Sequence, residues 1–305
     1  MTKTTDDLIA EFEAWLAGRD ITQYTRKDYP KYIRSFCKFF HGDLLSVDEE
    51  VLEGYVAYLR KRDVTQNSIK RYFTGLSNFF KFLVKRKYIA VNPAIPVQQD
   101  YLKSYKSRDT SQLKQVITVD QAKKMVASIL DPRERAVIVM LLKTGVRNHE
   151  LVELDVNDVD QPNLTVYLHP TTKRSNLEVY IDEETAHTLK RWLKQREKEN
   201  IHNLSALFLD RYGSRLTVRS SSRIVRKHAI ACGLHKQSSD LPRDRLSPHN
   251  FRYYFTTRML DAGMRPLFVQ YLRGDAGNKA MDLYNRINKA EVKDEYLRTV
   301  PRLGL

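Results

Sequence analysis

Four stripes of apolar residues at helical spacing occupy the first 90 residues and restrict what this part of the chain can form. The apolar positions recur every three or four residues, as on one face of an α-helix. They lie within residues 8–16, 29–40, 51–59 and 69–83. Helices of this kind bury their apolar faces against one another, so we expect a small helical bundle over residues 1–95.

Local signals indicate where these helices begin and end. Gly18 ends the first helix, and the second is expected to begin near Thr25. Pro30 lies too deep for a first-turn proline, so the second helix is expected to start later or to bend. Ser46-Val-Asp-Glu49 has the pattern of a capping box for the third helix, and Asn92-Pro93 ends the fourth.

Helical periodicity then fails from Ala94 to Gln115, where Pro96 is followed by polar and basic residues. We interpret residues 96–116 as a basic linker and residues 117–305 as a second domain. A linker of this kind would let the two domains close around a duplex.

The second domain is predicted to be mainly helical with a small antiparallel sheet. Thr118 is expected to cap its first helix, and a buried helix over 136–142 should end at Gly145. Alternating apolar residues at 164–168 and 177–181 predict two strands of a hairpin. Helices near 183–198 and 216–232 are expected to flank a short apolar strand at 206–209.

The charge of the chain indicates a polyanionic partner. Lys and Arg number 52 against 37 Asp and Glu, which gives a formal charge of +15 and a pI near 9.6. Nucleic acid is the usual partner of such a protein. Basic residues between apolar helix positions are often only a solvated face, but at this charge we favour a DNA-backbone surface. Its expected residues are Lys70, Arg71 and Lys81 in the bundle and Lys103, Lys106 and Arg108 in the linker.

Several other classes of protein are disfavoured. The N-terminus is acidic and amphipathic, and no apolar run approaches the roughly 18 residues that span a bilayer. Two cysteines in different halves are typical of a reduced, intracellular protein. His228, Cys232 and His235 offer three ligands and no fourth, so a polar helix end is favoured over a metal site. No phosphate loop for nucleotides is present.

Basic residues gather in sequence around a possible oxygen nucleophile. His249 and Arg252 are spaced to share one helix face, where both could reach one anion. Tyr284 follows a turn of sequence Asp-Ala-Gly-Asn, and Arg147 and Lys173 lie upstream. Each residue alone has an ordinary explanation, but together they indicate phosphoryl transfer.

Taken in order, these segments resemble the tyrosine recombinases, or phage-type integrases. The matching pieces are Thr144-Gly-Val-Arg147-x-x-Glu150-Leu151, a lysine in the following hairpin, Leu246-Ser-Pro-His249-x-x-Arg252, and Leu283-Tyr284. The N-terminal bundle and basic linker are similar to that family's SAM-like core-binding domain, so the resemblance covers essentially the whole chain.

The resemblance implies a role for each residue. Tyr284 would attack a scissile phosphodiester and form a 3′-phosphotyrosyl link. Arg147 and Arg252 would hold the non-bridging oxygens. Lys173 would donate a proton to the leaving 5′-oxygen, and His249 would hydrogen-bond the phosphate. Neither a metal nor another cofactor is implied, because the covalent link conserves the bond energy.

Glu150 and Asp275 are expected to act through neighbouring side chains. Glu150 is expected to orient a neighbouring side chain rather than to react. Asp275 stands where the family usually has histidine or tryptophan, and a carboxylate is repelled by a phosphate. It is therefore expected to hold Arg252, Arg273 or the Tyr284 hydroxyl, and its Leu-Arg-Gly-Asp-Ala context resembles integrases of archaea and their viruses.

The hairpin lysine is displaced by one position. Alignment on the second strand puts the family's lysine at Thr172, but hairpin length varies easily, so Lys173 is the choice, with Arg174 behind it.

The resemblance also implies partners. Residues 287–305 are expected to form a helix that docks on a neighbouring subunit and so links a homotetramer on two DNA core sites, and the alternative is that this helix packs in its own subunit. We expect an integrase acting between a mobile element and a chromosome, in the cytoplasm at the nucleoid. The alternatives are a chromosome-dimer resolvase of the same family and a DNA-binding regulator that has lost catalysis.

Overall fold

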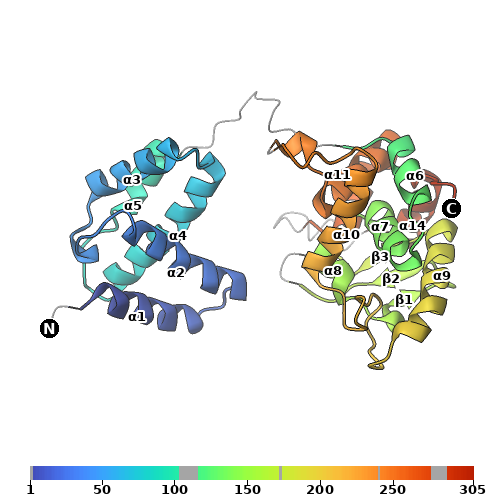
Figure 1. Ribbon diagram of the computed structural model, residues 1–305, viewed down its shortest axis with the longest axis horizontal. Coiled ribbons are helices and arrows are strands. Elements are labelled where there is room, and N and C mark those ends of the chain that lie inside the picture. The colour runs from blue at the N-terminus through green and yellow to red at the C-terminus, as the bar shows by residue number, and fades with distance from the viewer. Residues whose placement is uncertain (1–2, 103–115, 172–173, 240, 276–286) are drawn as a thin grey trace. The chain divides into compact units, whose positions relative to one another are not determined.

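The chain divides into two compact units, residues 1–108 and 109–305 (Figure 1). The computed structural model describes every residue except 1–2, 103–115, 172–173, 240 and 276–286. Both units are mainly helical, and the second unit contains a small antiparallel sheet, as predicted. Among the described residues, no helix has the length and apolarity needed to cross a membrane.

The N-terminal unit is a helical bundle around one aromatic-rich core. α2 packs along α4, and α5 packs against α3 and α4. Phe12, Phe36, Phe73 and Phe79 are entirely buried between these helices. The elements are α1 (Thr5–Ala17), α2 (Gln23–Cys37), the 3₁₀ helix η1 (Leu44–Ser46), α3 (Glu49–Lys61), α4 (Gln66–Lys85) and α5 (Ala94–Tyr101).

The starts of two helices differ from their predicted positions. α2 begins earlier than expected, because Thr22 caps it by accepting a hydrogen bond from the Thr25 backbone N–H at 3.3 Å. Pro30 lies inside this helix, where its ring is buried in the bundle. α3 is capped by Asp48 and not by Ser46, since the Asp48 carboxylate accepts from the Val51 N–H at 3.0 Å.

The predicted linker is wrong over its first residues. Residues 94–101 form α5, and Pro96 falls in its first turn, where the missing N–H would have no helical acceptor. Ala94, Val97 and Leu102 are buried in the core of the N-terminal unit. The basic residues Lys103, Lys106 and Arg108 lie outside the described part of the chain.

The second unit is built around α7, whose residues 136–144 are all buried. Thr118 caps α6, and Gly145 ends α7 in the left-handed region, both as predicted. The elements are α6 (Val119–Ala127), α7 (Pro132–Thr144), α8 (Asn148–Glu153), η3 (Val156–Asp158), β1 (Val159–Asp160), β2 (Thr165–Tyr167), β3 (Glu178–Tyr180), α9 (Glu183–Glu199), α10 (Val218–Ala231), η4 (Pro242–Asp244), α11 (Pro248–Asp261), α12 (Pro266–Arg273) and α14 (Lys289–Thr299).

The sheet has the order β1-β2-β3, and each neighbouring pair is antiparallel. The hairpin of β2 and β3 is confirmed, with Val166 paired to Val179. The strand predicted at 206–209 is wrong, because this buried segment makes only isolated bridges. Side chains supply part of its hydrogen bonding: Arg196 Nε donates to Ala206 O and Trp192 Nε1 to Leu207 O, each at 2.8 Å.

The C-terminal helix α14 packs within its own unit, which was the alternative to the expected docking on a neighbouring subunit. Val292 and Tyr296 are entirely buried, and the Tyr296 hydroxyl donates to Lys143 O at 3.1 Å. Beyond the helix, the backbone N–H groups of Leu303 and Gly304 donate to the Glu184 carboxylate at 2.8 and 2.7 Å. The Glu184 carboxylate, in the first turn of α9, therefore holds the backbone that follows α14.

Replacing Glu184 with Gln is expected to destabilise the protein at neutral pH and to have little effect in acid. Burial raises the Glu184 pKa, but hydrogen bonds from the chain end and the Lys143 ammonium lower it to about 2. A carboxyl group with a depressed folded-state pKa contributes stability above its unfolded value of about 4.3, and that stability is lost as pH falls toward the folded value. Thermal unfolding of both proteins from pH 7 to pH 2.5 measures the difference. A difference that persists unchanged in acid would contradict this assignment.

Candidate active site

The first part of the site is the turn between α7 and α8. Gly145 has a φ of +61°, and a Cβ there would lie 2.4 Å from the Phe255 ring, so only glycine fits. Arg147 follows at the N-cap of α8. Its backbone N–H and its Nη1 donate to the two oxygens of Glu150, at 2.7 and 2.9 Å. These bonds fix the Arg147 side chain and leave Nη2 directed into the site.

The second part is α11, which carries His249 and Arg252. Ser247 and Asn250 form a capping box, and Pro248 occupies the first helical position. Arg252 is buried, and its Nη1 donates to Gly145 O at 2.7 Å. His249 is exposed, with its ring edge-on to Tyr253 at a centroid distance of 4.9 Å. The helix thus presents a buried arginine and an exposed histidine in successive turns.

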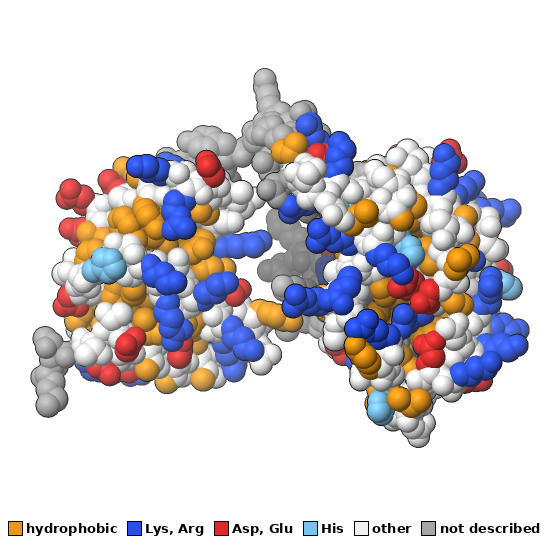
Figure 2. All heavy atoms as spheres, in the orientation of Figure 1, with side chains coloured by type: hydrophobic (Ala, Val, Ile, Leu, Met, Phe, Trp, Pro, Cys, Tyr) orange, Lys and Arg blue, Asp and Glu red, His pale blue; other side chains and the backbone are white. Residues whose placement is uncertain are grey.

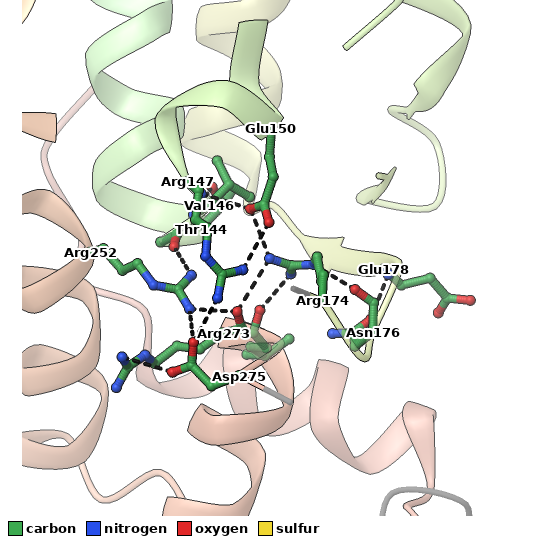
Figure 3. A network of polar contacts seen from close by, with 12 residues as sticks. Thr144, Val146, Arg147, Glu150, Arg174, Asn176, Glu178, Arg252, Arg273 and Asp275 are labelled. Carbon is green, nitrogen blue, oxygen red and sulfur yellow. Dashed lines mark hydrogen bonds and ion pairs between the residues drawn. The ribbon is translucent and has the colours of Figure 1, made fainter. Parts of the chain in front are cut away.

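Asp275 joins these parts, as Figure 3 shows. Its Oδ1 accepts from Arg147 Nη2 at 2.9 Å and from Arg252 Nη2 at 2.6 Å, and Arg273 reaches Oδ2 at 2.8 Å. Two of these partners, Arg252 and Arg273, were proposed for Asp275 from the sequence, whereas the contact with Arg147 was not foreseen. Two guanidinium groups that converge on a single oxygen form a binding site for an anion. We call the Arg147 and Arg252 guanidinium groups together the anion seat.

The charges of the site leave it positive. Burial raises the Glu150 pKa, but Arg174 and Arg147 hold it below its ordinary value. Burial lowers the pKa of Arg252 to about 10, which leaves its guanidinium charged at neutral pH. Four arginines face two carboxylates, so two positive formal charges are in excess: Arg147, Arg174, Arg252 and Arg273 against Glu150 and Asp275. That excess suits a phosphodiester, which carries one negative charge.

Two predicted site residues lie outside the described part of the chain. These are Lys173 in the hairpin and Tyr284, the predicted nucleophile. Thr172, the other position considered for the hairpin lysine, lies outside it as well. Arg174 is described, and its side chain has no exposed surface, so it is a poor substitute for a cation that must reach DNA.

The structure also gives Arg174 a role that the sequence did not indicate, and it brings in Asn176, which the sequence did not mark. Arg174 and Asn176 contact the backbone at the end of α12, about a hundred residues away in sequence. No local pattern identifies a side chain that caps a helix so distant along the chain. Only the adjacency of Arg174 to the hairpin lysine drew attention to it.

The expected DNA-contact residues of the bundle lie on one helix. Lys70, Arg71 and Lys81 lie on α4 outside its stripe of buried residues, which includes Ile69 and Phe73. Arg71 and Lys81 are exposed. Figure 2 shows Lys and Arg side chains gathered over the visible face of each unit. The three predicted DNA-contact residues that the structure describes therefore form a basic surface on α4.

The possible metal ligands have other partners. His228 Nε2 lies 2.6 Å from Glu134, and His235 Nδ1 lies 3.2 Å from Leu246 O. Within the described ranges, one group of ligand-type residues comes together, with atoms inside 4.8 Å: Asp155, Asp158 and His169. Arg215 donates a hydrogen bond to Asp155 at 2.5 Å, so the positive charge beside this carboxylate is already supplied by a guanidinium group.

Comparison with known proteins adds two family matches. Residues 111–291 match the model described as "Phage integrase family", and residues 9–87 match "Phage integrase, N-terminal SAM-like domain". The tyrosine recombinase XerC of Leptospira interrogans is 25% identical over 233 residues, which are 75% of this chain and 70% of that protein. XerC of Syntrophus aciditrophicus is 23% identical over 97% of this chain and 98% of its own length.

Solved structures share the fold. A lambda integrase fragment, crystallised as a dimer bound to a COC′ core site, aligns with a TM-score of 0.69 and 18% identity over 90% of this chain and 96% of that one. A lambda integrase tetramer bound to a Holliday junction aligns with a TM-score of 0.70 and 16% identity, over 97% of this chain and 78% of that one.

Proposed function

Because the chain belongs to the phage integrase family, we propose that it is a site-specific tyrosine recombinase that cuts and rejoins DNA through a 3′-phosphotyrosyl intermediate. The convergence of Arg147 and Arg252 on one oxygen of Asp275, at 2.9 and 2.6 Å, is the observation that carries this proposal. A non-bridging phosphate oxygen has the charge and size to bind the same two guanidinium groups while Asp275 holds them.

In this reaction the Tyr284 hydroxyl attacks the scissile phosphorus in line. A bond forms between phosphorus and the tyrosine oxygen, and the bond to the 5′-oxygen breaks. Arg147 and Arg252 stabilise the charge that develops on the non-bridging oxygens. Rejoining is the reverse step, in which a 5′-hydroxyl displaces Tyr284, so no nucleotide cofactor is consumed.

Two further side chains would move protons. Lys173 gives a proton to the leaving 5′-oxygen, because an alkoxide leaves poorly. His249, exposed at the start of α11, hydrogen-bonds the phosphate and takes up the proton that the Tyr284 hydroxyl loses as it attacks. Glu150 acts through Arg147, whose backbone and side chain it binds.

The DNA partner would contact both units. The basic face of α4 and the linker residues Lys103, Lys106 and Arg108 would bind the backbone of a core site. We propose a homotetramer on two sites, by likeness to the lambda integrase tetramer on a Holliday junction. α14 packs in its own unit, so a link between subunits through this segment would require its exposed face or its release. We also propose that the protein acts at the nucleoid, where such a DNA substrate would lie.

Two biological roles fit the chemistry. We favour integration of a mobile element, and the Leu272-Arg-Gly-Asp-Ala segment supports a finer likeness to integrases of archaea and their viruses. The likeness to bacterial XerC recombinases favours the second role, resolution of chromosome dimers. Sequencing the recombinant junctions formed in cells distinguishes them, because integration joins element to chromosome and resolution joins chromosomal sites.

A nicked suicide substrate tests the proposed activity. Cleavage beside the nick releases a short fragment that diffuses away, so the covalent complex accumulates. The expected product is a protein–DNA adduct that resists denaturation, with the phosphotyrosyl peptide identified by mass spectrometry. The absence of any adduct on sites that the protein binds would favour the DNA-binding regulator instead.

Asp275 is expected to support cleavage by holding the arginines, and not by touching DNA. Replacing Asp275 with Asn keeps its shape but removes the charge that three guanidinium groups share. Hydrogen bonds to charged groups contribute about 1.5–3 kcal/mol, so cleavage should slow by about ten- to a hundredfold. DNA affinity should not fall, because a negative charge beside the phosphate is lost. Single-turnover cleavage and binding assays measure both quantities, and wild-type cleavage by the variant would refute this role.

A further inference from the structure

Among the described residues of the site, Arg174 has the most completely buried charged side chain, with no exposed surface. Its Nη1 donates to Glu150 Oε2 at 2.9 Å and to Arg273 O at 3.3 Å. Its Nη2 donates to Leu272 O at 2.8 Å, and its Nε donates to Asn176 O at 2.5 Å. The planar fork of one arginine thus holds a carboxylate and three backbone carbonyls at once.

These bonds cap the end of α12. The last carbonyl groups of a helix have no partner within it, and buried ones must find partners elsewhere. Arg174 takes Leu272 O and Arg273 O, and Asn176 Nδ2 takes Tyr271 O at 2.8 Å. The turn that follows is shaped around the same side chain: a Cβ on Gly274, whose φ is +61°, would lie 2.6 Å from Arg174 Cγ. That turn leads directly to Asp275.

Arg174 also shares one acceptor with each arginine of the anion seat (Figure 3). Glu150 accepts from Arg174 and from Arg147. Arg273 O accepts from Arg174 and, at 2.6 Å, from Arg252 Nη2. A shift of the Arg174 guanidinium would therefore move the partners of both arginines.

We propose that Arg174 is a positioning residue for phosphate binding, which sets the spacing of the Arg147 and Arg252 guanidinium groups and the place of Asp275 without touching DNA. The proposal rests on the proposed function, because the seat is assigned to the scissile phosphate. A displacement of about 1 Å in a reacting geometry can slow a reaction about a hundredfold.

The test is Arg174→Lys in the full-length protein. Lysine keeps the charge, but one ammonium group cannot span four acceptors in a plane. Arg196→Lys is the matched control, because Arg196 is also buried and donates to backbone carbonyls, Ala206 O at 2.8 Å and Leu204 O at 2.6 Å, away from the site. Both variants should lower the melting temperature. Only Arg174→Lys should slow suicide-substrate cleavage at saturating DNA, by about a hundredfold.

A substrate with a neutral methylphosphonate at the scissile position separates positioning from general loss of structure. Such a substrate develops less charge, so the exact spacing of two guanidinium groups matters less to it. The cleavage defect of Arg174→Lys should shrink to less than about tenfold on this substrate. An equal defect on both substrates, or no defect on either, would overturn the proposal.

Inorganic phosphate gives a readout that does not depend on cleavage. In ¹⁵N spectra of the arginine side chains, phosphate should shift the Arg147 and Arg252 signals together in the wild type and in Arg196→Lys. Much weaker phosphate binding by Arg174→Lys is expected. If wild type forms no adduct but this difference holds, the recombinase function fails and the positioning role stands. If the variant binds phosphate as wild type does, the positioning role fails.

Discussion

A Tyr284→Phe variant is expected to form no covalent adduct with a nicked core site, while its affinity for the same DNA stays within about twofold of wild type. Phenylalanine keeps the ring and removes only the oxygen that would bond to phosphorus. Loss of a nucleophile costs on the order of a millionfold where it has been measured in a serine protease, so no adduct should be detectable. Denaturing gels report the adduct, and electrophoretic mobility shifts report binding.

Tyr167→Phe is the matched control for this change. Tyr167 is an exposed tyrosine of the same unit, on β2, and its hydroxyl should have no part in the reaction. Its variant should form adduct at the wild-type rate. An adduct formed by Tyr284→Phe would show that another residue is the nucleophile, and mapping the attached peptide would identify it.

Replacing Arg252 with Lys is expected to lower the cleavage rate by about a hundred- to a thousandfold, as removal of one transition-state hydrogen-bond donor does elsewhere. Arg252 contacts Asp275, Gly145 O and Arg273 O at 2.6–2.7 Å. A lysine cannot reach all three, so the phosphate seat loses its geometry although the charge is kept. Stability should also fall, by about 1–3 kcal/mol for each buried carbonyl left without a partner.

Comparison with Arg258→Lys separates these two effects. Arg258 lies on the same helix and pairs with Asp261 at 2.8 Å, away from Asp275. Its variant should cleave at the wild-type rate.

Because the pKa of Arg252 is lowered only to about 10, the wild-type cleavage rate should show no loss of this charge between pH 7 and about 9. A wild-type rate for Arg252→Lys would remove this residue from the phosphate site.

Much of the fold could be predicted from the sequence, because helix propensity and apolar spacing are local. The stripes that became α1 to α4, the Thr118 cap, the Gly145 stop and the β2–β3 hairpin all follow from neighbouring residues. The predictions of helix starts and ends failed where two residues near each other in sequence gave competing signals. Asp48 replaced Ser46 as the cap of α3, and Pro96 hid the short helix α5.

For the candidate site, too, some features could be predicted from the sequence and others could not. Arg147, His249, Arg252 and Tyr284 were named from ordered motifs in the chain, and so was the departure at Asp275. The sequence alone also determined the charge excess and the residue types suited to a phosphate. It could not show that Asp275 would bind Arg147, which lies 128 residues earlier.

Only the tertiary structure decided how the arginines are held. Arg174 and Asn176 cap α12 across about a hundred residues, and Gly274 is required by the approach of Arg174. A hydrogen bond of this kind depends on where two distant backbones come to lie, and burial makes its acceptors depend on it. Local spacing determines which groups a helix presents, whereas the packing of separate elements determines which of those groups meet.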